Sequence, residues 1–137
     1  MIEAGAPISF KTELFKGIHS FTTDTFKIAL YDETASLTLA GTTAYTSTGE
    51  VTGTGYTAGG INLTGASVSD DQGKATVTFN DATFTGAVVT YRAALVYNAT
   101  KSNRAVLIID FGPADGPETS PTIKMPSASA VTALLRM

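Results

Sequence analysis

The chain contains no cysteine, no tryptophan and only one histidine among its 137 residues. Without cysteine it can form no disulfide framework, no thiolate metal site and no cysteine nucleophile. A single histidine is also a poor basis for a transition-metal site. We therefore expect no metal and no other cofactor, and the sequence shows no recognisable catalytic set, which predicts a protein that is not an enzyme.

Charged side chains are scarce as well. They make up 15% of the chain, the net charge is −3, and the Lys and Arg residues are scattered along the sequence. Scattered basic residues argue against direct binding to nucleic acid. Since 43% of the residues are apolar and the uncharged remainder is rich in Thr, Ser and Gly, the composition fits a surface that rests against other protein.

The N-terminus has no basic segment followed by an apolar stretch, and no apolar run approaches membrane-spanning length. We therefore expect a soluble protein that is made in the cytoplasm and has no membrane partner. A chain of 137 residues predicts a single domain, 1–137, whose core is large enough to need no disulfide or metal.

Apolar and polar residues alternate with a period of two along most of the chain after the first twenty residues. Two segments joined by the polar connection 98–103 are apolar on both faces, which predicts paired central strands. A helical spacing of apolar residues predicts one short N-terminal helix at 9–18. The predicted strands are 25–31, 74–80, 88–97, 105–111, 121–125 and 130–136.

Short strands separated by turn-rich segments are typical of an antiparallel β-sandwich or barrel. The prediction is an all-β fold, an antiparallel two-sheet β-sandwich with a short N-terminal helix. Ile108 is expected in its core.

Three charged or titratable residues lie near these strongly apolar segments. Arg92 and Arg104 are expected to pair with Asp110 or Asp81, because pairing is the usual reason for a buried charge. His19 follows the predicted helix with no recognisable catalytic partners in the sequence, and we interpret it as a structural residue.

Residues 51–65, VTGTGYTAGGINLTG, contain five of the 13 glycines. The spacing of Gly53, Gly55 and Gly59 superficially resembles a phosphate-binding loop. Such a loop requires a strand before it and a helix after it, and neither flank has that pattern. We therefore interpret the segment as a structural loop whose glycines permit positive φ angles and close backbone approach.

Three segments together resemble a family of small virion proteins of tailed bacteriophages, found among capsid-assembly genes. The resemblance covers most of residues 11–112. It implies a jelly-roll-like β-fold and a capsid cement or decoration protein on the virion surface, with the major capsid protein as partner and a homo-oligomer, dimer or trimer, as its own state. The segments are KTELFKGIHSFTTDTFKIALY, TTAYTSTGEVTGTGYTAGG and YRAALVYNATKSNRAVLIIDFG.

With this role, residues 49–60 are expected to form a flexible loop that fits itself to a capsid or sister-subunit surface. The candidate interface residues are Gly53, Gly55, Tyr56, Gly59 and Gly60. Two alternatives stay open. One is another virion subunit, in the tail or the head–tail connector, and the other is a carbohydrate-binding β-sandwich module, which has less support because the chain has no tryptophan to stack on sugar rings.

Overall fold

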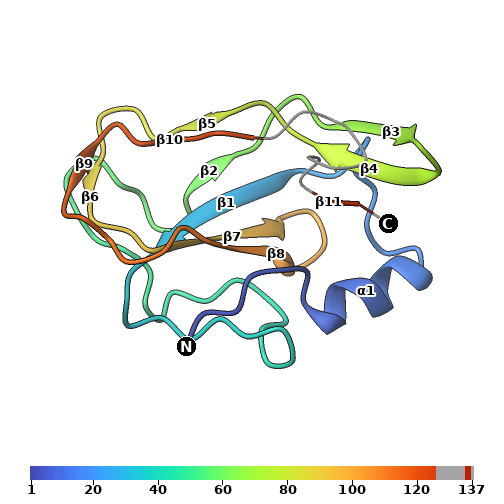
Figure 1. Ribbon diagram of the computed structural model, residues 1–137, viewed down its shortest axis with the longest axis horizontal. Coiled ribbons are helices and arrows are strands. Elements are labelled where there is room, and N and C mark those ends of the chain that lie inside the picture. The colour runs from blue at the N-terminus through green and yellow to red at the C-terminus, as the bar shows by residue number, and fades with distance from the viewer. Residues whose placement is uncertain (126–134, 137) are drawn as a thin grey trace.

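The computed structural model describes residues 1–125 and 135–136. It is mostly β, with antiparallel pairing between all its named strands and one short helix (Figure 1). In chain order the elements are α1 (Ile8–Phe15), β1 (Phe26–Tyr31), β2 (Ile61–Asn62), β3 (Ser67–Asp71), β4 (Lys74–Thr78), β5 (Ala82–Thr83), β6 (Val88–Val89), β7 (Ala93–Asn98), β8 (Arg104–Asp110), β9 (Glu118–Thr119), β10 (Thr122–Ile123) and β11 (Leu135–Arg136).

The largest sheet has the strand order β2-β1-β7-β8. The two strands predicted to pair, β7 and β8, form an antiparallel hairpin whose register shifts between Val96 and Tyr97. Beyond β8, single bridges at Ile108 and Arg104 join it to Gly5 and Ala44. The predicted hairpin is therefore confirmed, and β8 is flanked by irregular chain in place of a further strand.

Two predicted elements change most. The helix ends at Phe15 because Gly17, with φ of +71°, reverses the chain as the helix-stop signal indicates. The expected strand 88–97 divides into β6 and β7, because β6 pairs with β9 whereas β7 pairs with β1 and β8. A continuous apolar run does not reveal where the chain changes partners. Of the expected strand 130–136, only residues 135–136 lie among the described residues.

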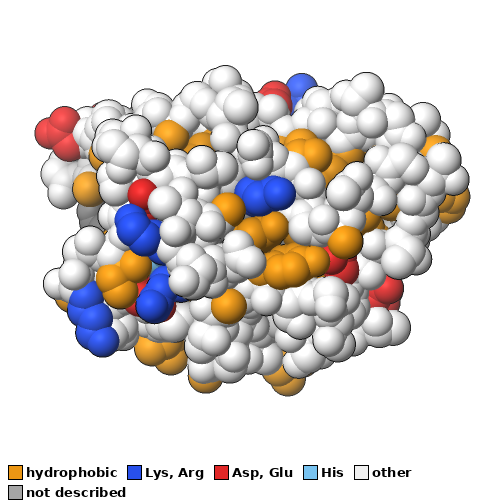
Figure 2. Space-filling view, turned by 180° about the vertical axis from the view of Figure 1, so that it is seen from behind, with side chains coloured by type: hydrophobic (Ala, Val, Ile, Leu, Met, Phe, Trp, Pro, Cys, Tyr) orange, Lys and Arg blue, Asp and Glu red, His pale blue; other side chains and the backbone are white. Residues whose placement is uncertain are grey.

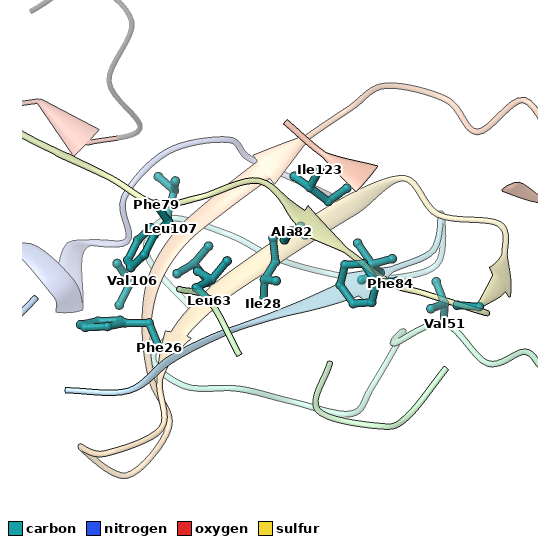
Figure 3. Packing of buried hydrophobic residues seen from close by; sticks show 14 of the residues in the cluster. Phe26, Ile28, Val51, Leu63, Phe79, Ala82, Phe84, Val106, Leu107 and Ile123 are labelled. Carbon is teal, nitrogen blue, oxygen red and sulfur yellow. The ribbon is translucent and has the colours of Figure 1, made fainter. Parts of the chain in front are cut away.

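One core lies between the four-stranded sheet and the shorter strands that cross it (Figure 3). Alternate residues of β1, Phe26 and Ile28, point into it, as the period of two predicts. Phe79 and Phe84 come from the opposite side, and Phe79 lies with its ring centroid 5.8 Å from that of Phe26. This core sets the spacing of the two groups of strands.

A second core covers the other face of the same sheet. Tyr31, Leu95 and Ile108 pack there against Leu37, which belongs to the loop chain beneath the sheet in Figure 1. Ile108 is 1% exposed, which confirms that it is a core residue. Both faces of the central strands are buried, which explains why their sequences are apolar on both faces.

Candidate protein interface

The predicted interface loop lies at one end of the β structure, on the left of Figure 1. The chain enters it from Glu50, which forms a bridge with Tyr31. Val51 is buried and donates its N–H to the carbonyl of Leu30 at 3.0 Å. Strand β2 follows the glycines where a phosphate-binding loop would require a helix, which agrees with the structural interpretation of the loop.

Gly53 and Gly55 lie against the turn that precedes β6. A Cβ atom on Gly53 would lie 2.3 Å from the carbonyl oxygen of Val88, and one on Gly55 would lie 2.2 Å from that of Gly86. Gly55 also has φ of +76°. Because these neighbours are backbone atoms held in their own turn, the two positions require glycine.

Gly59 and Gly60 return the loop to β1. Their φ angles are +94° and +80°, and a Cβ atom on Gly60 would lie 1.8 Å from the carbonyl oxygen of Ile28. The carbonyl of Gly59 accepts a hydrogen bond from the Tyr97 hydroxyl at 2.5 Å. These glycines are therefore needed for the fold itself.

A buried carboxylate, that of Glu50, holds the loop from beneath. Its Oε1 accepts a hydrogen bond from the Tyr45 hydroxyl at 2.5 Å. Its Oε2 accepts one from the Tyr56 hydroxyl at 2.7 Å and one from the Gly59 N–H at 2.8 Å. We call these four residues the Glu50 anchor. All three of its donors are neutral groups.

The tyrosines of the Glu50 anchor remain protonated at neutral pH. Burial raises the pKa of Tyr56 well above its usual range; the N–H of Leu30 opposes this effect and Glu50 adds to it. Burial, together with the hydrogen bond to Glu50, raises the pKa of Tyr45 to about 12. The loop that was expected to be flexible thus has hydrogen-bonded attachment points at Tyr56 and Gly59.

The outer side of the loop remains open to solvent. Thr54 accepts the N–H of Val88 through its carbonyl at 2.8 Å, which joins the loop to the turn before β6. The sequence has no charged residue at 51–69 or at 82–91. We define the uncharged end as the exposed residues that these two segments contribute here: Thr52, Thr54, Thr57, Ala58, Thr85 and Val88.

The five predicted interface residues do lie in one segment, and they shape the uncharged end from within. Gly59 is buried, and Tyr56 points its hydroxyl inward to Glu50 and Leu30. Gly53 and Gly55 are exposed, and the threonines beside them, which were not among the predicted residues, provide the exposed side chains. Glu50 was also missed, since nothing in the sequence distinguishes a buried carboxylate from a solvated one.

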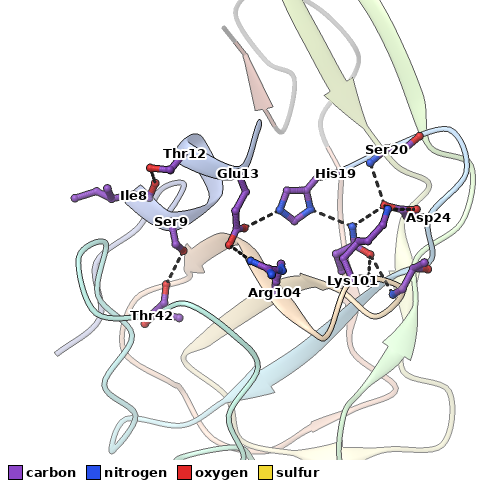
Figure 4. A network of polar contacts seen from close by, with 12 residues as sticks. Ile8, Ser9, Thr12, Glu13, His19, Ser20, Asp24, Thr42, Lys101 and Arg104 are labelled. Atoms are coloured by element: carbon purple, nitrogen blue, oxygen red, sulfur yellow. Dashed lines mark hydrogen bonds and ion pairs between the residues drawn. The ribbon is translucent and has the colours of Figure 1, made fainter. Parts of the chain in front are cut away.

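A second polar cluster joins α1 to the β7–β8 hairpin, at the other end of the molecule (Figures 1 and 4). The His19 side chain is fully buried, with Nε2 2.9 Å from Glu13 Oε1 and Nδ1 3.0 Å from Asn98 Nδ2. Arg104 donates to the other oxygen of Glu13 at 2.8 Å. Both ring nitrogens of His19 are thus occupied by contacts that tie the helix to the sheet.

Asn98 determines where the proton of His19 lies. Its Oδ1 accepts the N–H groups of Thr100 and Lys101 at 3.1 and 3.2 Å, so its Nδ2 is the atom that faces His19 and Asp24. The histidine Nδ1 is therefore an acceptor and its Nε2–H a donor. Each side-chain nitrogen and oxygen of His19 and Asn98 thus has a defined role as donor or acceptor.

Asp24 is a further buried carboxylate of this cluster. Burial raises its pKa, but hydrogen bonds from Asn98, Lys101 and the Ser20 N–H together outweigh burial and lower it to about 2. The Lys101 ammonium lies 2.9 Å from Asp24 Oδ2. Asp24 is thus ionised at neutral pH and fixes the start of β1 against the hairpin.

The two arginines have carboxylate partners, one of which was predicted. Arg92 pairs with Asp110 at 2.9 Å, as expected, and also with Glu33 at 3.0 Å. Arg104 pairs with Glu13 and not with an aspartate, so that prediction was wrong. Its partner lies 91 positions away in the chain, on the helix, where strand neighbours give no hint of it.

No group of three or more His, Asp or Glu side chains is placed to hold a metal ion in residues 1–125 and 135–136. In the same part of the chain, no helix has the length and apolar character needed to cross a membrane. The chain matches no protein-family model, no curated protein and no solved structure.

Proposed function

We propose that this protein is a non-enzymatic capsid cement or decoration protein of a tailed bacteriophage. It binds the outer surface of the major capsid protein shell and stabilises it across capsomer boundaries. We propose in addition that its antiparallel sheets form a jelly-roll-like sandwich. The core shared by the four-stranded sheet and the shorter strands supports that arrangement.

The uncharged end is the observation that carries this proposal. None of the residues of the uncharged end carries a charge, so docking them desolvates no charged side chain of their own, which lowers the cost of burying this surface. The Lys27 ammonium lies at its edge, 4.0 Å from where a Cβ atom on Gly59 would stand. Figure 2 shows a face on which most of the surface is uncharged, with basic side chains concentrated toward the end on its left. A capsid offers many equivalent sites, so individually modest contacts can hold a small protein firmly.

The Glu50 anchor strengthens this argument. A loop whose backbone is already fixed loses less conformational entropy on docking than a flexible one. The exposed threonines are thus presented on a pre-formed backbone, with Val88 as an apolar contact beside them. This suits repeated binding to a rigid lattice of identical subunits.

Substitutions on the uncharged end test the proposal. The doubly substituted variant Thr52→Arg/Thr57→Arg adds bulk and charge at exposed side chains without touching the required glycines. Wild-type and variant protein would be added to phage shells that lack the protein, and occupancy and resistance to heat measured. A loss of about 1–2 kcal/mol per contact lowers occupancy about tenfold or more.

The matched control is Ser67→Arg, an exposed position at the start of β3, where binding should remain as in the wild type. Equal binding by a folded Thr52→Arg/Thr57→Arg variant would remove the uncharged end from the interface. Failure of the wild-type protein to bind shells would reject the cement function. Density in the tail or connector by cryo-electron microscopy of particles would support the alternative virion role.

A further inference from the structure

Helix α1 is apolar on both of its faces. Phe10 is buried and Leu14 packs against the first core, as the helical spacing predicts. On the opposite face, Ile8 is 57% exposed and Phe15 is 90% exposed, and the seven-residue separation places them on one line along the helix. A phenylalanine that projects almost fully into water gains nothing for the fold of a single chain.

Two lysines flank this exposed phenylalanine. Lys11 and Lys16 are both exposed, and neither forms an ion pair with any residue of the described chain, whereas the neighbouring Lys101 and Arg104 are paired. Figure 2 shows basic side chains gathered around hydrophobic ones at this end of the molecule. We call Ile8, Lys11, Phe15 and Lys16 the helix knob.

A hollow bordered by acidic residues lies toward the other end of the long axis, beside the connection from β8 to β9 (Figure 1). It is a small hollow of about 130 Å³, partly open to solvent. Phe111, 43% exposed, stands edge-on to Tyr91 with ring centroids 5.5 Å apart. Its lining residues are Tyr91, Phe111, Gly112, Pro113, Ala114, Asp115, Gly116 and Glu118.

Two exposed carboxylates border this aromatic hollow. Glu118 accepts a hydrogen bond from the Tyr91 hydroxyl at 3.1 Å, and Asp115 lies on the connecting loop. Neither forms an ion pair with a lysine or arginine of the described chain. The hollow therefore offers a mostly polar lining with two aromatic rings, Tyr91 and Phe111, and two carboxylates that have no cationic partner within the described chain.

We propose that the helix knob of one copy of this chain docks into the hollow of a second copy. The two features match in charge, since two unpaired cations meet two unpaired carboxylates, and the projecting Phe15 ring meets the rings of Tyr91 and Phe111. They lie at different ends of the same molecule, so the contact joins copies head to tail. Such a contact closes into a ring or continues as a chain, depending on the rotation between copies.

The first test is the mass of the wild-type protein in solution. Sedimentation equilibrium should show association that strengthens with protein concentration and weakens as salt is raised, because exposed charge pairs are screened. Phe15→Ser should weaken the association at least tenfold while the melting temperature stays unchanged, because that side chain has few contacts within its own chain. A wild-type protein that remains monomeric throughout overturns the proposal.

Charge exchange gives the sharper test. Lys11→Glu/Lys16→Glu makes both surfaces acidic, and Asp115→Lys/Glu118→Lys makes both basic, so each variant alone should be monomeric. An equal mixture of the two restores opposite charges at every contact and should recover the association of the wild type. Association by either variant alone, or failure of the mixture to associate, would overturn the pairing of these two surfaces.

The matched control is Val68→Ser, which removes another exposed apolar side chain, 51% exposed on β3. It should leave association unchanged. An equal loss with Val68→Ser and Phe15→Ser would mean general stickiness and would also overturn the proposal. These measurements need no capsid, so their outcome is independent of the cement function.

Discussion

The two ends of the molecule each contain a buried carboxylate, and they stabilise it in different ways. Glu50 is 9% exposed and accepts hydrogen bonds from two tyrosine hydroxyls and a backbone N–H. Glu13 is 7% exposed and is held by Arg104 and His19. One site uses neutral dipoles from the core, while the other uses a partly exposed cation.

The two ends therefore differ in whether the buried carboxylate requires a charged side chain near the surface. Because the Glu50 anchor needs no cation, the residues of the uncharged end can all be uncharged, which is the property that the proposed capsid contact uses. The α1 end depends on Arg104 and Lys101, and its surface carries basic side chains as a consequence. The two ends are therefore suited to different partners, and their responses to mutation and pH should differ.

The largest effect is expected where the uncharged end meets the sheet. Gly60→Ala should cost at least about 4 kcal/mol of unfolding free energy or prevent folding, because the new Cβ would overlap the Ile28 carbonyl oxygen. Gly73→Ala is the matched control, since Gly73 has φ of +79° with no atom within 4 Å of the added Cβ. Its cost should be about 1–2 kcal/mol by urea unfolding. Equal costs would contradict the close approach.

The next prediction compares the two carboxylates directly. Glu50→Ala leaves the buried Gly59 N–H and two partly buried tyrosine hydroxyls without an acceptor and should cost about 3–5 kcal/mol. Glu13→Ala should cost less, about 1–3 kcal/mol, because the Arg104 side chain is 41% exposed and can turn to water. Glu50→Gln keeps the shape and one acceptor and should recover most of the loss. Urea unfolding of all three variants measures this, and the reverse order would refute the comparison.

Much of the fold could be predicted from the sequence because strands and cores follow local periodicity. Alternation identified β1 and β4, and the continuous apolar runs identified the β7–β8 hairpin. The division between β6 and β7 could not be predicted, because it depends on the pairing of β6 with β9, which lies further along the chain. The cover over the second face of the sheet is irregular chain and has no period to detect.

The glycines drew attention to the loop of the proposed interface, but they did not indicate how that loop is held. A glycine-rich segment indicates that the backbone approaches other atoms closely, but it does not show whether these belong to the same chain or to a partner. The structure shows that Gly55 and Gly60 face backbone oxygens of the protein itself, so substitutions there would test folding and not docking. The partner of Arg104 was missed for the same reason as Glu50, because charge pairing across the fold leaves no trace in local sequence.

Acid should act on the α1 end. The pKa of Asp24 is about 2 when folded and about 4 when unfolded, so its contribution is complete above pH 4 and is lost as the pH falls from 4 toward 2. Asp24→Asn should cost up to about 2 kcal/mol at pH 7, and the difference from wild type should vanish near pH 2. Urea unfolding across this range measures it. Asp70→Asn, at an exposed carboxylate, should follow the wild type, and a constant Asp24→Asn deficit would exclude this role.

Alkali should act on the Glu50 end. The pKa of Tyr45 is about 12 when folded, because burial and Glu50 disfavour the phenolate, and about 10 when unfolded. Its contribution is therefore complete below pH 10 and is lost as the pH rises from 10 toward 12. Tyr45→Phe should cost about 1–2 kcal/mol at pH 7, and the deficit should shrink above pH 10. Phenolate absorbance provides an independent check, since the Tyr45→Phe variant should have one tyrosine fewer that ionises well above pH 10. Ionisation of Tyr45 near pH 10 in the folded protein would mean that its hydroxyl is not a buried donor to Glu50. The contrast between the Glu50 end and the α1 end would then not hold for Tyr45.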